Sequence, residues 1–255
     1  MTEEGIVCDV TTAYEHYQVI DTIYNGRSAR ILYSDNHYAA QSGLAFDDQD
    51  ELLFDYIQRF IELVRGVEPK SLLLIGGGTC TLPKAILEDF PDIKMDIVEI
   101  DGELLDIATN YFSFLPGLHT KFHALDGREY LDKATEPYDM ILIDAFIETS
   151  IPKSLQTVEA AAQISRLLNS DGVFAINIIS SYYGRRSDVL RREIAALQTH
   201  FNNLQIYPAS NNISLWSPQN FVLTADNNNL ALDDYLRFAG LGLFEVLPNE
   251  AIFDQ

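Results

Sequence analysis

Residues Ser71-Leu-Leu-Leu-Ile-Gly-Gly-Gly78 decide the fold of this chain. They predict a short buried strand that runs directly into a glycine loop, and the following segment, Thr79–Phe90, has helical character. Glycines let the backbone turn sharply and approach a ligand closely, and a helix that begins there directs unpaired N–H groups at the same place. The stretch therefore predicts a nucleotide-binding turn in a parallel α/β sheet.

Acidic residues follow the next three predicted strands, where ligands of open α/β sheets bind. Glu99 and Asp101 follow the first, and Glu99 can accept both ribose hydroxyls of a nucleoside. Asp126, before Gly127, can accept the exocyclic amine of adenine. Asp144 ends a buried strand, where a carboxylate is costly to desolvate, so we expect it to be catalytic or to orient a substrate. Each acid also has an ordinary alternative: Glu99 can be a surface acid, Asp126 part of an Asp-Gly turn, and Asp144 a cap on the following loop.

The N-terminal part of the chain predicts a small antiparallel sheet, which we assign to residues 1–46. Strands are expected over 17–24 and 29–33, joined by the hairpin signal Asn25-Gly26, with a short third strand near 37–40.

Helical periodicity over 47–65 then predicts a linker helix, within a segment that we place at residues 47–70. From there strands and helices alternate, and the strands read as continuous apolar runs, which is typical of buried parallel sheets. We therefore expect residues 71–255 to form a doubly wound, mostly parallel, seven-stranded Rossmann-like α/β domain.

Composition narrows the class of ligand. The net charge of −21 argues against nucleic acid and against an anionic membrane surface, although solubility alone is a sufficient reason for it. A cationic small substrate such as an amine suits this charge better. With two cysteines, no signal peptide and no apolar run near 20 residues, we expect a cytoplasmic protein. No metal site is expected.

A nicotinamide-dependent dehydrogenase is the competing interpretation. Its fingerprint is G-x-G-x-x-G/A, and here Gly76 and Gly78 are followed by Thr81, which would crowd helix against strand. The extra acids Asp126 and Asp144 suit an adenosyl-sulfonium nucleoside better than a dinucleotide.

With these residues in place, residues 14–225 resemble the spermidine synthase family, the polyamine aminopropyltransferases built on the S-adenosylmethionine-dependent methyltransferase fold. The motifs that carry the resemblance are Tyr17-Gln18, Gln41-Ser42-Gly43, Asp50-Glu51, Gly76-Gly77-Gly78, Val98-Glu99-Ile100-Asp101, Asp126-Gly127 and Tyr138-Asp139 with Asp144. The resemblance implies that Asp144 is catalytic: it deprotonates an amine that displaces the nucleoside sulfur. It also implies a cofactor site made by Gln18, Gln41, Gly76, Gly77, Gly78, Glu99, Asp101, Asp126, Gly127 and Asp144.

The sequence departs from the family where the aminopropyl group and the acceptor are bound. The family's glycine loop continues with an aspartate, which Thr79 replaces, and a hydroxyl cannot supply a charge-assisted contact of roughly 1.5–3 kcal/mol. Thr79 and Thr81, with the helix N–H groups, can instead receive the carboxylate of intact S-adenosylmethionine. The family's Tyr-His pair aligns with Phe54-Asp55, so a phenol and an imidazole are lost. Glu148 can take the place of the family's second catalytic acid.

We therefore expect a spermidine-synthase-like transferase with S-adenosylmethionine, or its decarboxylated form, as co-substrate. The alkyl group transferred is expected to be methyl and the acceptor a cationic amine or similar small nucleophile. A true spermidine synthase is the first alternative, and a non-catalytic nucleoside-binding relative is the second. The resemblance also implies a homodimer through the N-terminal sheet.

Overall fold

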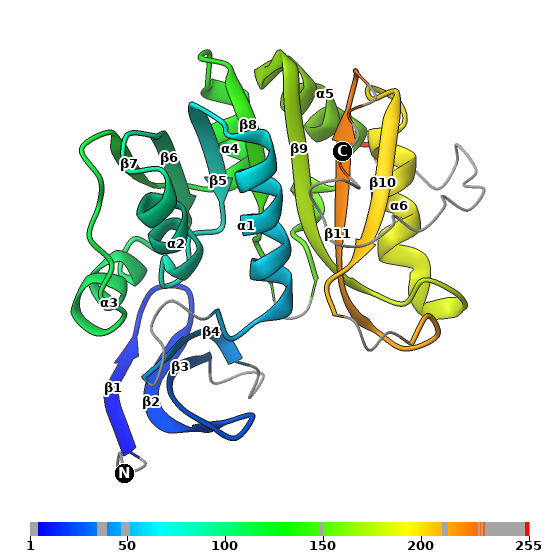
Figure 1. The fold of residues 1–255 in the computed structure, drawn as a ribbon. Coiled ribbons are helices and arrows are strands. Elements are labelled where there is room, and N and C mark those ends of the chain that lie inside the picture. The colour runs from blue at the N-terminus through cyan, green and yellow to red at the C-terminus, as the bar shows by residue number, and fades with distance from the viewer. Residues whose placement is uncertain are drawn as a thin grey trace.

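The computed structural model describes residues 5–34, 40–46, 52–147, 150–210, 214–228, 230, 232 and 253–254. Two sheets organise them: a four-stranded antiparallel sheet near the N-terminus, and a seven-stranded, mostly parallel sheet that carries helices on both faces (Figure 1). This arrangement confirms the predicted α/β fold class with its small additional sheet. None of the helices in the described ranges is long and apolar enough to cross a membrane.

The N-terminal sheet has the strand order β1-β2-β3-β4, with bounds Gly5–Thr11, His16–Tyr24, Arg27–Ser34 and Ala40–Ala45. Asn25 and Gly26 connect β2 to β3 with φ of 49° and 82°, the two positive values that a type I′ hairpin turn requires.

Two features of this sheet differ from expectation. β1 was not predicted, because it lies at the sheet edge and most of its residues are exposed, so it lacks a buried face. The strand predicted near residues 37–40 is described as β4 and begins at Ala40; residues 35–39 lie outside the described part of the chain. Small residues with weak strand propensity dominate β4, which explains the imprecise boundary.

The larger sheet has the strand order β10-β11-β9-β8-β5-β6-β7, in which β11 runs antiparallel to both neighbours. The strands are β5 Ser71–Ile75, β6 Lys94–Glu99, β7 Thr120–Ala124, β8 Tyr138–Ile143, β9 Leu168–Ser180, β10 Asn203–Pro208 and β11 Gln219–Asp226. β5 lies between β6 and β8, and the chain builds outward in opposite directions from this position. Ligand crevices form where strand order reverses in this way.

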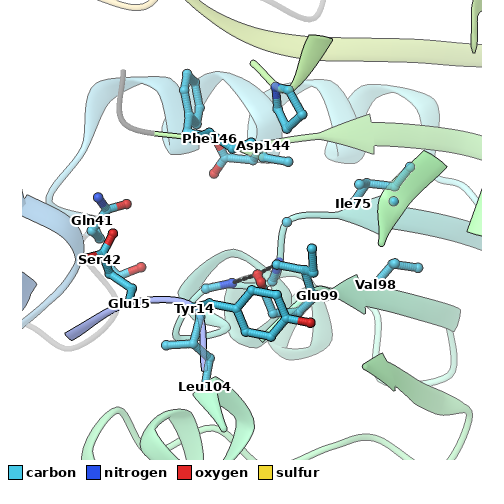
Figure 2. A pocket seen from close by; sticks show the side chains of 18 of the residues that line it. Tyr14, Glu15, Gln41, Ser42, Ile75, Val98, Glu99, Leu104, Asp144 and Phe146 are labelled. Carbon is cyan, nitrogen blue, oxygen red and sulfur yellow. Dashed lines mark hydrogen bonds between the residues drawn. The ribbon is translucent and has the colours of Figure 1, made fainter. Parts of the chain in front are cut away.

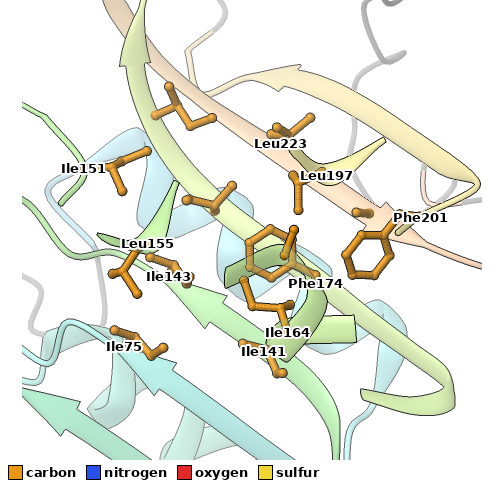
Figure 3. Packing of buried hydrophobic residues seen from close by; sticks show 14 of the residues in the cluster. Ile75, Ile141, Ile143, Ile151, Leu155, Ile164, Phe174, Leu197, Phe201 and Leu223 are labelled. Atoms are coloured by element: carbon orange, nitrogen blue, oxygen red, sulfur yellow. The ribbon is translucent and has the colours of Figure 1, made fainter. Parts of the chain in front are cut away.

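Alternate residues of the buried strands face two apolar cores. One core packs against α5 and α6, and Figure 3 shows part of it around Phe174 and Leu197. The other packs Leu72, Leu74 and Leu142 against α1 and α2. The helices are α1 Asp55–Val67, α2 Thr81–Asp89, α3 Leu104–Tyr111, α4 Gly127–Lys133, α5 Val158–Leu167 and α6 Asp188–Leu197, with 3₁₀ turns at Lys153–Leu155 and Arg185–Ser187. The predicted helix over 47–65 corresponds to α1, and residues 47–51 lie outside the described ranges.

Side-chain contacts hold the small sheet against the larger domain at the two ends of α3. Arg30 of β3 donates to the backbone carbonyl of Tyr111 at 3.0 Å, and the Thr12 hydroxyl after β1 donates to Asp101 at 2.5 Å. Figure 1 shows the small sheet beside the end of the larger sheet where α1 begins. The two sheets therefore enclose the space around the glycine loop.

Candidate active site

A cavity of about 560 Å³ lies between the two sheets. Its walls are the glycine loop after β5, the carboxyl ends of β6 and β8, the first turns of α1, α2 and α4, and side chains of the small sheet. Figure 2 shows Glu99 and Asp144 on opposite sides of this space, with Gln41 and Ser42 on the side of the small sheet. The crevice predicted beside the glycine loop is thus open rather than filled by protein atoms.

Gly76 requires glycine for two reasons. Its φ is +94°, a conformation that side-chain-bearing residues rarely adopt, and a Cβ there would lie 2.3 Å from the backbone oxygen of Asp144. Its N–H donates to the carbonyl of Val98 at 2.8 Å. Only a bare backbone can therefore pass between the ends of β6 and β8 and bring the loop to the cavity.

Glu99 holds the glycine loop through its carboxylate. Its Oε2 accepts hydrogen bonds from the N–H groups of Gly77 at 2.9 Å and Gly78 at 3.0 Å, and its Oε1 accepts one from the N–H of Asp101 at 3.1 Å. Burial raises the pKa of Glu99, while these backbone donors act to lower it. Oε2 thus uses both of its lone pairs on the glycine loop, whereas Oε1 retains one, so the carboxylate can accept a further hydrogen bond from a ligand at Oε1.

Asp126, Gly127 and Gln41 also line the cavity, as the sequence predicts for ligand-binding residues. Asp126 caps α4: its Oδ1 accepts hydrogen bonds from the N–H groups of Arg128 at 2.9 Å and Glu129 at 3.0 Å. Gln41 donates to the Ser34 hydroxyl at 3.3 Å. The capping bonds fix the Asp126 carboxylate at the cavity wall.

Three predicted binding residues lie behind the wall or outside it. Gln18 donates to Asp9 at 2.8 Å on the exposed part of the small sheet. Asp101 is buried and accepts hydrogen bonds from Thr12 and from the hydroxyl of Tyr17, so it supports a lining residue and does not itself face the cavity. Thr79 is fully buried, and its hydroxyl has no hydrogen-bond partner.

Asp144 stands at the end of β8 with part of its surface open to the cavity. Its Oδ1 accepts a hydrogen bond from the Asn177 amide at 2.9 Å, and the Tyr56 hydroxyl donates a second. Burial raises the pKa of Asp144 to about 7, and the nearby Glu99 charge adds to this, whereas the two donors act to lower it. A carboxyl group that titrates near neutral pH can accept and release a proton under working conditions.

The structure supplies partners that sequence reasoning missed. Tyr56, two positions after Phe54 on the first turn of α1, lines the cavity and donates a hydrogen bond to Asp144. One indication of Asn177 was present in the sequence, because it is an amide within the apolar run of β9. That it bonds Asp144 could not be predicted from the sequence. Glu148, the predicted second acid, lies outside the described residues.

The charged residues of the cavity lining are mostly acidic. Among the described lining residues, Lys153 is the only basic one. The acidic ones are Glu15, Glu99, Asp126 and Asp144. No three His, Cys, Asp or Glu side chains in the described ranges lie close enough together to hold a metal ion. Such a lining favours a cationic ligand through its electrostatic field.

Comparisons with known proteins identify two kinds of relative, named as aminopropyltransferases and as methyltransferases. A "Polyamine aminopropyltransferase" of Vibrio vulnificus (strain CMCP6) is 38% identical over 140 residues, covering 53% of this chain and 47% of the relative. The human "eEF1A lysine and N-terminal methyltransferase" is 29% identical over 180 residues, covering 62% of this chain and 23% of the relative. The chain thus matches less than half the length of each.

Solved structures share the fold. A probable spermidine synthase from Corynebacterium glutamicum ATCC 13032 superposes with a TM-score of 0.73 at 18% identity, over 89% of this chain and 81% of that one. Human Methyltransferase-like protein 13, solved with SAH, superposes with a TM-score of 0.58 at 23% identity, over 74% and 93%. Residues 59–207, more than half of the sequence, match the spermine/spermidine synthase domain, and the chain therefore belongs to the spermine/spermidine synthase domain family.

Proposed function

We propose that this protein is an S-adenosylmethionine-dependent transferase that moves a methyl group to a small cationic amine. The observation that carries the proposal is the position of Asp144, a carboxyl group with a pKa of about 7, across an open cavity from the Glu99-bound glycine loop. One side of the cavity is suited to a nucleoside, and the other to a group that loses a proton.

The glycine loop, Glu99 and Asp126 form the nucleoside side of this proposal. The free lone pair on Oε1 of Glu99 accepts a ribose hydroxyl, and Asp126 accepts the exocyclic amine of adenine. Gln41 lies across the cavity on the small sheet and encloses the ligand. The acidic lining attracts the positive sulfonium of S-adenosylmethionine.

Asp144 performs the proton step. The Asp144 carboxylate takes a proton from the ammonium group of the substrate, which requires that Asp144 be ionised at the start. The neutral amine nitrogen then attacks the methyl carbon, the carbon–sulfur bond breaks, and the electron pair stays on sulfur, which becomes a neutral thioether. The methylated product leaves as an ammonium. Turnover is therefore expected to rise with pH through about 7, where Asp144 loses its proton.

The residues after the glycine loop favour intact S-adenosylmethionine over the decarboxylated form. Thr79, Cys80 and Thr81 place no acid there to bind a primary ammonium group. Thr81 lines the cavity on the first turn of α2, and no side chain caps this helix. A helix N-terminus with a hydroxyl beside it is suited to the carboxylate of the methionine moiety.

Aminopropyl transfer from decarboxylated S-adenosylmethionine, as in a true spermidine synthase, is the second candidate. The 38% identity with a protein named polyamine aminopropyltransferase favours it, and so does the acidic cavity, which suits a diamine.

Calorimetry with four ligands tests these proposals. S-adenosylmethionine, its decarboxylated form, methylthioadenosine and NAD are titrated into the protein, and consumption of the bound sulfonium is then followed with a panel of di- and polyamines. We expect S-adenosylmethionine to bind more tightly than its decarboxylated form and to be consumed. The reverse order of affinity would select aminopropyl transfer. Binding without consumption would indicate a non-catalytic relative, and NAD as the tightest ligand would refute both transferase proposals.

A further inference from the structure

The polar side chains behind Asp144 form a chain of hydrogen bonds with a defined direction. We propose that Asn220 and Asn177 are positioning residues that together present an N–H donor to Oδ1 of Asp144 and so keep its carboxylate oriented toward the incoming amine. The proposal rests on the proposed function only in the role that it gives to Asp144; the hydrogen-bond geometry is independent of which group is transferred.

Sheet register brings the three side chains to one face. Ile143 pairs with Ile176 in the parallel β8–β9 ladder, so Asp144 lies beside Asn177. Asn177 pairs with Val222 across the antiparallel β9–β11 ladder, and Asn220, two residues before Val222, points to the same face. Diagonal neighbours of this kind are within reach of each other's side chains.

Two distances define the chain of bonds. Nδ2 of Asn220 donates to Oδ1 of Asn177 at 2.9 Å, and Nδ2 of Asn177 donates to Oδ1 of Asp144 at 2.9 Å. An amide has a donor end and an acceptor end, so satisfying one end determines what the other end presents. Because Asn220 occupies the Asn177 carbonyl, Asn177 can turn only its NH₂ group toward the carboxylate. The opposite orientation would place oxygen against oxygen and nitrogen against nitrogen.

The surroundings explain why this pair acts through Asp144. Asn177 is 1% exposed, on the strand face whose neighbouring residues Ala175 and Val222 pack in the apolar core beneath α1. A buried amide without partners would cost on the order of 1–3 kcal/mol. Neither Asn177 nor Asn220 lines the cavity, so neither can contact a substrate there. Within the described part of the chain, the hydrogen bond from Asn177 to Asp144 connects this pair to the site.

The other groups around Asp144 do not replace this donor. Tyr56 donates from α1, and Glu99 on β6 is a negative charge that opposes ionisation of Asp144. The remaining titratable side chains of the cavity lining are Tyr14, Glu15, Tyr17, Asp126 and Lys153. Of the two donors, Asn177 has the larger effect in lowering the pKa of Asp144. The direction of the Asn177 amide therefore helps to set the pH at which Asp144 is ionised.

Reversing the direction of the chain is the test. In Asn220→Asp a carboxylate can only accept, so Asn177 turns its NH₂ group toward residue 220 and its carbonyl toward Asp144. The added charge alone is controlled by Gln219→Glu, at the adjacent position of β11, which donates to Ser214 and does not contact Asn177. Asn177→Leu removes the donor without adding charge. The readout is the titration of ¹³C-labelled aspartate carboxyl groups by NMR, with the Asp144 signal assigned by its absence in Asp144→Asn.

We expect Asn220→Asp to raise the pKa of Asp144 by about one unit more than Gln219→Glu does, and Asn177→Leu to raise it by a similar amount. If Asn220→Asp titrates like Gln219→Glu, or if Asn177→Leu leaves the midpoint unchanged, the proposed positioning role is wrong. The NMR titration requires no turnover, so a shift in an enzyme that consumes no sulfonium would refute the proposed function and support the positioning role.

Discussion

Glu99 and Asp144 are both carboxylates at the ends of β6 and β8, the parallel strands on either side of β5, yet the protein holds them in different ways. Glu99 is fixed by backbone N–H groups of the adjacent glycine loop and of Asp101. Asp144 is fixed by side chains, Tyr56 from α1 and Asn177 from β9, and Asn177 is itself bonded by Asn220 from β11. One acid is thus held by backbone donors, and the other by side chains from separate elements.

The difference corresponds to two tasks. A carboxylate bonded to backbone N–H groups is rigid and suits binding, because those donors move only with the loop itself. A carboxylate bonded to side chains can be adjusted residue by residue, which suits a group that must titrate near neutral pH. Burial raises the pKa of both acids, so the donors around each one determine how far it departs from ordinary behaviour.

Asp144→Asn gives the largest expected effect, because an amide cannot accept the amine proton. Turnover should fall by about 10²–10⁴-fold, the usual contribution of a general base, while the affinity for S-adenosylmethionine stays within a few-fold. Asp106→Asn, the same substitution on an exposed side chain of α3, is the matched control for activity assays and calorimetry. Full activity in Asp144→Asn would remove Asp144 from the mechanism.

Glu99→Gln should produce the complementary result: weakened binding. Glutamine offers one acceptor oxygen where the glutamate uses two, and its NH₂ group must face either the glycine loop or the N–H of Asp101. Loss of charge-assisted bonds predicts affinity for S-adenosylmethionine lower by about 10–150-fold, measured by calorimetry. Glu103→Gln, an exposed neighbour, should bind like the wild type. Unchanged affinity in Glu99→Gln would contradict the binding task assigned to this acid.

Tyr56→Phe should give the smallest effect of the three variants, because it removes one donor to Asp144 and leaves the carboxylate in place. Removing a donor to the carboxylate favours its protonated form, so the pKa of Asp144 should rise from about 7 by about one unit. Turnover at pH 7 should then fall about fivefold and recover at higher pH, seen as an alkaline shift of the rising limb of the pH–rate profile. Tyr183→Phe, on an exposed side chain, should leave the profile unchanged. An equal loss at every pH would mean that Tyr56 acts by another route.

Sequence patterns were sufficient for most of the fold. Continuous apolar runs such as Met140–Ile143 and the amphipathic run of α1 depend on neighbouring residues only, so they predict the strands and helices that the structure contains. β1 was missed because an exposed edge strand buries too little to leave a pattern. The ends of helices were less precise, as at α1, which continues to Val67 where the periodicity predicted an end at residue 65.

For the candidate site, prediction worked where position in the chain determines position in space. Gly76, Glu99, Asp126 and Asp144 all lie at the cavity because carboxyl ends of parallel strands meet at one edge of the sheet. Asp101 shows the limit: two residues after Glu99, its side chain turns toward Thr12 of the small sheet.

The amino-acid sequence alone determined that a glycine loop follows a buried strand and that acids stand at the ends of its neighbours, since glycine content and apolar runs are local properties. Only the tertiary structure decided what surrounds each acid. Tyr56, Asn177 and Asn220 lie far from Asp144 in the chain. Helix placement brings Tyr56 to it, and strand register brings Asn177 to Asp144 and Asn220 to Asn177. A shift of one residue in that register would turn each amide to the other face of the sheet, so no local pattern can encode the contact.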